Sequence, residues 1–248
     1  MRITEVRAVQ PATPGAPADW RTQLGQIVVH IATDSALHGY GVGGGGAAGI
    51  HVIESVLRDF LIGKDAREVE QLHAGMCRHT CFYGRAGLTI MALSGVDLAL
   101  WDLRGKAAGQ PVARLLNKDV DLSRPLPTYL TVFDEQETET ALNAGHQAVK
   151  LHVERFGVPP RVSALSDQVT KARDILGNQG ELMIDAFAKW DVASALEVAN
   201  AIQKQDVAWL EEPIPPDDYA GYRELVRKSP VPIAGGEHEY LSKGFQHL

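Results

Sequence analysis

The chain has 248 residues, of which 45% are apolar and 22% are charged. This composition is typical of a soluble globular protein and excludes disordered, collagen-like and coiled-coil chains. With 24 Lys and Arg residues against 31 Asp and Glu residues, the formal net charge is −7. Proteins that bind nucleic acids or anionic membranes need a basic face, so we expect neither kind of partner.

The sequence also indicates the cellular compartment. No apolar run approaches the roughly 20 residues of a membrane span, and residues 1–5 (MRITE) do not resemble the start of a signal peptide. The chain has two cysteines, which cannot form a disulfide framework. We therefore expect a cytoplasmic protein.

The first third of the chain predicts three antiparallel strands followed by helices, which is an α+β arrangement. The strands are expected at residues 3–10, 26–33 and 37–42. The glycine-rich stretch 39–49 is expected to end this meander and to form a loop, because so many glycines cannot hold a regular strand. Apolar residues at three- and four-residue steps then predict helices, and the segment 86–108 is apolar nearly all round, as a buried helix would be.

Beyond residue 126, strands and helices alternate. The expected strands are 128–133, 148–153, 181–184, 208–210 and 232–234, with helices at 135–144, 162–176, 192–204 and 219–227. Successive βα units predict a parallel sheet or barrel. We therefore expect an α/β protein with two domains, residues 1–124 and 125–248.

Three acids stand where expected strands end. Asp185, Glu211 and Glu237 are each separated by 26 residues, which is one βα unit. In a β/α barrel the strand C-termini converge on one mouth. Three carboxylates that meet there repel one another unless a hard cation lies between them, and all-oxygen ligation favours Mg²⁺. The alternative is that each acid only caps the next helix.

Four segments resemble the enolase superfamily, specifically its mandelate racemase branch. They are ALSGVDLALWDLRGK (92–106), MIDAF (183–187), WLEEPIPPDDYAGY (209–222) and GGEHEY (235–240). Their order and spacing match the family over nearly the whole chain, and the PPDDY and GEHE details are most similar to L-rhamnonate dehydratase-like acid-sugar dehydratases. The resemblance implies an α+β capping domain followed by a modified (β/α) barrel, of which about five βα units are present.

The resemblance also implies a function. Asp185, Glu211 and Glu237 would bind Mg²⁺, and the enzyme would remove the α-proton of a sugar-acid carboxylate and then eliminate water. A divalent cation beside the developing charge lowers the barrier to such proton abstraction. Racemisation or epimerisation of a hydroxy acid is an alternative, because it shares the first step. A catalytically silent protein is another.

The expected base is on the second barrel strand. Lys150 and His152 stand two residues apart, so they point to the same side of a strand. The mandelate racemase branch often carries Lys-x-Lys here, and His152 would replace the second lysine. Lys150 would neutralise charge or, if desolvated, titrate near neutrality. His152 would act as the base, and the alternative is that it only forms hydrogen bonds.

Other residues of the family site are absent from these five strands. The dehydratases carry a His–Asp dyad on the sixth and seventh strands and another acid on the eighth. The chain would then be part of a longer enzyme, obtain the missing strands from another chain, or be a degenerate relative. Five strands leave an open edge, so we expect a homo-oligomer.

Weaker candidates remain. Arg21, His38 and His238 are expected to contact the sugar-acid substrate. The alternative is that Arg21 and His38 are ordinary exposed loop residues and that His238 only forms a hydrogen bond with the backbone.

Residues 39–44 (GYGVGG) fit the dinucleotide-binding pattern G-x-G-x-x-G, but the parallel strand that should follow is missing. Cys77 and Cys81 with His73 suggest a zinc site, yet no second Cys pair exists, so reduced thiols are expected.

Overall fold

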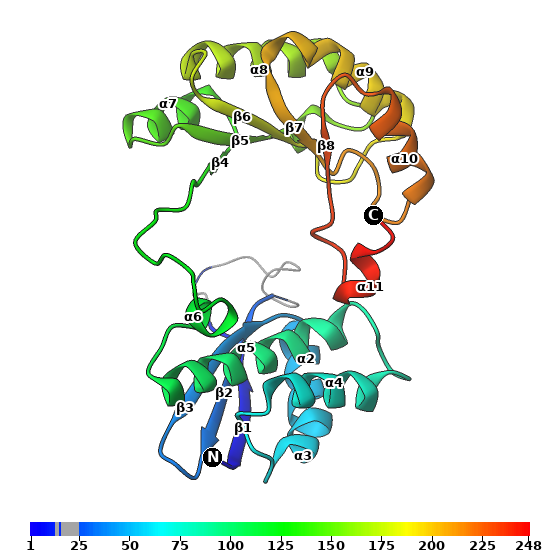
Figure 1. The fold of residues 1–248 in the computed structure, drawn as a ribbon. Helices are drawn as coiled ribbons and strands as arrows, with labels where there is room; N and C mark the ends of the chain where they lie inside the picture. The colour runs from blue at the N-terminus through cyan, green and yellow to red at the C-terminus, as the bar shows by residue number, and fades with distance from the viewer. Residues whose placement is uncertain (13–14, 16–24) are drawn as a thin grey trace. The chain divides into compact units, whose positions relative to one another are not determined.

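The structure is a computed structural model that describes residues 1–12, 15 and 25–248. It divides into two compact units, Met1–Ser123 and Arg124–Leu248, which are described separately (Figure 1). No helix in these described ranges is both long enough and apolar enough to cross a lipid bilayer.

The first unit is an antiparallel sheet packed against helices, as the sequence predicted. Its strands are β1 (Ile3–Val9), β2 (Ile27–Thr33) and β3 (His38–Gly43), in the order β1-β2-β3. The helices are α2 (Gly46–Val52), α3 (Arg58–Leu61), α4 (Val69–Thr80), α5 (Leu88–Ala108) and α6 (Val112–Leu116), with a π-helical turn, η1 (Ile53–Leu57), between α2 and α3. Helix α5 confirms the helix expected at 86–108. It is buried along one face from Ile90 to Gly105, whereas Leu88, Met91 and Leu98 on its other face are exposed.

The strand predicted at 37–42 is confirmed as β3, but the expectation that the glycine-rich stretch 39–49 forms a loop is wrong. Gly39, Gly41 and Gly43 lie within β3, which pairs regularly with β2, and they occupy its buried face. A Cβ atom on Gly41 would lie 2.1 Å from the carbonyl oxygen of Gly95 in α5. The glycines are therefore needed because the strand backbone packs directly on the helix backbone. Since β3 is antiparallel to β2, this segment also lacks the βαβ topology of a dinucleotide site.

The second unit is a parallel sheet of five strands in chain order. The strands are β4 (Leu130–Val132), β5 (Ala148–His152), β6 (Glu181–Asp185), β7 (Val207–Glu211) and β8 (Ile233–Ala234). The helices are α7 (Glu135–Asn143), α8 (Val162–Leu176), α9 (Val192–Ile202), α10 (Tyr219–Lys228) and α11 (Leu241–Phe245), with 3₁₀ turns η2 (Glu154–Phe156) and η3 (Gln203–Gln205). Neighbouring strands joined in sequence by helices confirm the predicted βα units, and the sheet corresponds to part of a (β/α) barrel.

The helices of this unit cover one face of the sheet, and the polar side chains lie on the other face. Helices α7 to α10 lie along one face (Figure 1). The core between them and the sheet contains Leu151, Ile184 and Leu210, one from each central strand. Because successive side chains on a strand alternate between faces, Lys150 and Asp185 must lie on the opposite face.

Candidate active site

The carboxyl ends of the three central strands are in register. His152 pairs with Asp185, Asp185 pairs with Glu211, and Glu211 pairs with Ala234. In-register residues of parallel strands point to the same face. The side chains of His152, Asp185 and Glu211 therefore share the face of the sheet that the helices leave uncovered.

Lys150 holds two of the predicted metal ligands together. Its Nζ atom lies 2.7 Å from Glu211 Oε1 and 3.0 Å from Asp185 Oδ2, and all three side chains are at most 14% exposed. Burial alone would lower the pKa of Lys150, but its hydrogen bonds to Glu211 and Asp185 outweigh burial and raise that pKa. Of the two roles expected for Lys150, these contacts favour charge neutralisation over titration near neutrality, because Lys150 is the charged partner of two carboxylates.

The remaining oxygens of these two carboxylates are also fixed. Asp185 Oδ1 accepts a hydrogen bond from the backbone N–H of Phe187 at 3.1 Å. Glu211 Oε2 accepts one from the indole Nε1 of Trp209 at 2.9 Å. Trp209 is not among the predicted site residues, although its place two residues before Glu211 on the same strand puts it on the same face.

Two of the three predicted ligands, Asp185 and Glu211, fit a divalent cation. Asp185 and Glu211 already converge on one positively charged atom, and their oxygens are the hard donors that Mg²⁺ prefers. Glu237 lines a cavity of about 200 Å³ together with Glu211 and Glu212. Burial and then the negative charge of Glu212 raise the pKa of Glu237, as expected for a carboxylate crowded by other acids without a metal ion.

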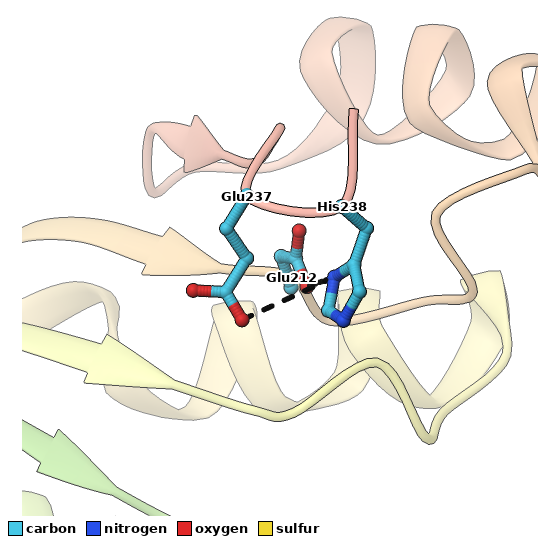
Figure 2. Close-up of side chains that lie close together, drawn as sticks. All are labelled: Glu212, Glu237 and His238. Atoms are coloured by element: carbon cyan, nitrogen blue, oxygen red, sulfur yellow. Dashed lines mark hydrogen bonds and ion pairs between the residues drawn. The ribbon is translucent and has the colours of Figure 1, made fainter. Parts of the chain in front are cut away.

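The three potential metal ligands that lie closest together at this site are a different set of side chains. Glu212, Glu237 and His238 each offer a ligand atom, and these atoms lie within 4.8 Å of one another (Figure 2). Among the residues that the structure describes, no other group of three potential ligands is this close. His238 Nδ1 donates to Glu212 Oε2 at 2.8 Å, so its partner is a side chain rather than the backbone.

The backbone after β6 and β7 takes an unusual conformation. Phe187, Ala188 and Glu212 have φ angles of 59°, 56° and 41°, in the left-handed region that residues other than glycine rarely adopt. The two segments are joined by a hydrogen bond from Ala188 N to Glu212 O at 2.6 Å. Such strain is concentrated at functional sites, and no sequence pattern indicated it here.

His152 lies between two aromatic rings. Its ring centroid is 5.2 Å from that of Phe133 and 5.2 Å from that of Phe187. Within the described ranges neither ring nitrogen of His152 has a hydrogen-bond partner. Contacts with these two aromatic rings therefore orient the imidazole.

The structure does not test two of the predicted substrate contacts. Arg21 lies outside the described residues. His38 belongs to β3 of the first unit, where its ring stacks on His30 and its Nδ1 lies 2.8 Å from His30 Nε2. Cys77 and Cys81, also in that unit, are free thiols.

Comparison with known proteins agrees with this architecture. Residues 3–117 match the N-terminal domain of mandelate racemase and muconate lactonizing enzymes, and residues 134–248 match the enolase C-terminal domain-like family. The chain is 34% identical to a 3,6-anhydro-alpha-L-galactonate cycloisomerase of Streptomyces coelicolor, over 99% of this chain and 68% of that protein. It is 35% identical to an L-rhamnonate dehydratase of Saccharopolyspora erythraea, over 91% of this chain and 57% of that protein.

A solved structure shows the same fold. A racemase from Streptomyces coelicolor with bound magnesium superposes with a TM-score of 0.85 at 31% identity, over 99% of this chain and 72% of that one. The chain thus spans between about half and three quarters of the length of these relatives. Both domain matches, the capping α+β unit and the parallel βα sheet show that the chain belongs to the enolase superfamily, in its mandelate racemase and muconate lactonizing enzyme branch.

Proposed function

We propose that this chain carries the metal-binding and proton-abstracting part of a Mg²⁺-dependent sugar-acid dehydratase. The observation that carries the proposal is the convergence of Asp185 and Glu211 on one cationic centre, the Lys150 ammonium, at the carboxyl ends of β6 and β7. The named relatives support the substrate class, since a galactonate and a rhamnonate are both sugar-acid anions.

Asp185, Glu211 and Glu237 would hold Mg²⁺. When bound, the ion supplies positive charge beside the substrate carboxylate, where negative charge develops as the α-proton leaves. The Lys150 ammonium adds a second positive charge on the same face of the sheet. Phe187 N and Trp209 Nε1 hold the carboxylates of Asp185 and Glu211 in place.

His152 would take the α-proton. A neutral imidazole nitrogen accepts the proton, and the electron pair of the broken C–H bond forms a double bond between the α-carbon and the carboxylate carbon, so that negative charge moves onto the carboxylate oxygens. The bond between the β-carbon and its hydroxyl then breaks as a double bond forms between the α- and β-carbons. The hydroxyl takes up the proton held by His152 and leaves as water, and the resulting enol tautomerises to a 2-keto-3-deoxy acid. Contacts with the Phe133 and Phe187 rings would orient the imidazole toward the substrate.

Racemisation or epimerisation is a second candidate, favoured by the similarity to the magnesium-bound racemase. It shares the proton abstraction and differs in returning a proton to the same carbon. The two reactions are separated by their products, because racemisation forms no keto acid.

The test is hydrogen exchange at the α-carbon. The protein with Mg²⁺ is incubated in D₂O with a panel of aldonic acids, and proton NMR follows the α-proton and any keto acid. We expect loss of the α-proton signal together with keto-acid formation for at least one aldonate, and neither in His152→Gln. His146→Gln, which alters a histidine before the opposite end of β5, should retain both. No exchange in any aldonate, or full exchange in His152→Gln, would overturn the proposal.

A further inference from the structure

Glu212 and His238 form a pair beside the proposed Mg²⁺ ligands that the proposed function does not use. The Glu212 side chain is only 3% exposed, and its second oxygen, Oε1, accepts from Gly236 N at 3.3 Å. His238 Nδ1 lies 2.8 Å from Glu212 Oε2 and 4.0 Å from Glu237 Oε1. A carboxylate, an imidazole and a second carboxylate thus surround one point (Figure 2).

The spacing of these atoms suits a tetrahedral metal ion. With metal–ligand bonds of about 2.0–2.2 Å, two ligands of a tetrahedral zinc ion are roughly 3.4 Å apart. The distances of 2.8 Å and 4.0 Å lie on either side of this value. Small side-chain rotations, with the Nδ1 proton of His238 released, would therefore bring all three ligands to one ion.

The chemistry of the donors differs from that of the proposed Mg²⁺ site. Asp185, Glu211 and Glu237 offer only oxygen, whereas the second set includes an imidazole nitrogen, which suits zinc and similar transition metals better than Mg²⁺. We propose that Glu212, Glu237 and His238 form a separate binding site for Zn²⁺, with three protein ligands and a fourth position open to water.

Glu237 belongs to both ligand sets, an overlap that rests on the proposed function. Zn²⁺ bound with Glu212 and His238 withdraws Glu237 from Mg²⁺. Zn²⁺ therefore competes with Mg²⁺ although the two ions occupy different positions. Such competition would make the enzyme sensitive to zinc.

The experiment measures the affinity of the protein for Zn²⁺ and for Mg²⁺ by isothermal titration calorimetry, with three variants. His238→Gln should weaken Zn²⁺ binding at least tenfold and leave Mg²⁺ affinity within threefold of wild type. Asp185→Asn should do the reverse. Glu237→Gln should weaken both. The pair of His30 and His38 in the first unit offers a matched control, because His30→Gln removes one histidine of this pair and should leave the Glu212 site intact.

Failure of the zinc site and failure of the proposed function give different results. Zn²⁺ affinity that is unchanged in both His238→Gln and Glu237→Gln would overturn the inference, as would a wild-type protein that does not bind Zn²⁺. Failure of the proposed function gives a different result, namely no Mg²⁺ binding by the wild type with Zn²⁺ binding retained. Circular dichroism of each variant confirms that a lost affinity does not reflect unfolding.

Discussion

The Nζ atom of Lys150 lies 2.7 Å from Oε1 of Glu211 and 3.0 Å from Oδ2 of Asp185. In this state the ammonium supplies the positive charge that two buried carboxylates require. A bound divalent cation would use the same carboxylate oxygens. Lys150 and the cation are therefore linked through Asp185 and Glu211, and the linkage can be measured as stability.

Lys150→Met should destabilise the protein when Mg²⁺ is absent. The variant leaves two carboxylates without their counter-charge, and removing one member of a buried ion pair costs about 3–5 kcal/mol. Mg²⁺ should then stabilise the variant more than the wild type, because the ammonium no longer competes for the same oxygens. Urea unfolding with and without Mg²⁺ measures both effects.

Lys171→Met is the control for this prediction. Lys171 pairs with Glu135 at 3.0 Å, but its side chain is 63% exposed, and such surface pairs contribute at most about 1 kcal/mol. If Lys150→Met costs no more than Lys171→Met, the carboxylates are not held by Lys150 as the structure indicates.

Trp209→Phe should weaken Mg²⁺ binding while preserving the fold. The change removes the N–H that orients Glu211 Oε2 at 2.9 Å, and loss of such a partner to a metal ligand typically costs 10–100-fold in affinity. Calorimetric titration with Mg²⁺ measures the change. Trp101→Phe, in α5 of the first unit, should leave the affinity unaltered, and an equal affinity in Trp209→Phe would contradict the orienting role.

Gly41→Ala should destabilise the first unit strongly. The new methyl group would lie 2.1 Å from Gly95 O and 2.6 Å from Ala99 N, both backbone atoms of α5. Because neither atom can move without displacing the helix, the cost should reach about 3 kcal/mol, at the upper end of what overpacking usually costs.

Gly44→Ala provides the comparison for Gly41→Ala. Its methyl group would meet only the Met91 side chain, at 3.3 Å or more, so we expect a loss below about 1 kcal/mol. Urea midpoints at equal slope give both values. Similar midpoints for the two variants would show that β3 does not pack on α5 as closely as described.

Much of this architecture could be predicted from the sequence, for reasons specific to particular elements. Helix α8 was expected at 162–176 and is found at Val162–Leu176, because its apolar residues recur with helical period and glycine follows it. The strands of the second unit alternate with such helices. The short helices α6 and α11 were not predicted, because five residues are too few to show a period.

Other features depend on partners that a single segment does not reveal. The glycines of β3 are required by the backbone of α5, which lies about 50 residues further along the chain. The raised pKa of Lys150 depends on Glu211, 61 residues away. The pairing of Glu212 with His238 did have a sequence signal, since these residues are 26 apart, the same spacing that identified the three acids.

Asp185 is proposed as a ligand for Mg²⁺, and the thermal stability of the Asp185→Asn variant tests this role most directly. At 100 times its dissociation constant, Mg²⁺ should stabilise the wild type by about 2.7 kcal/mol, seen as a rise in melting temperature. Asp185→Asn should show no such rise, whereas Glu181→Gln, at the opposite end of β6, should show the full rise. A melting temperature of Asp185→Asn that rises with Mg²⁺ as in the wild type would contradict the claim.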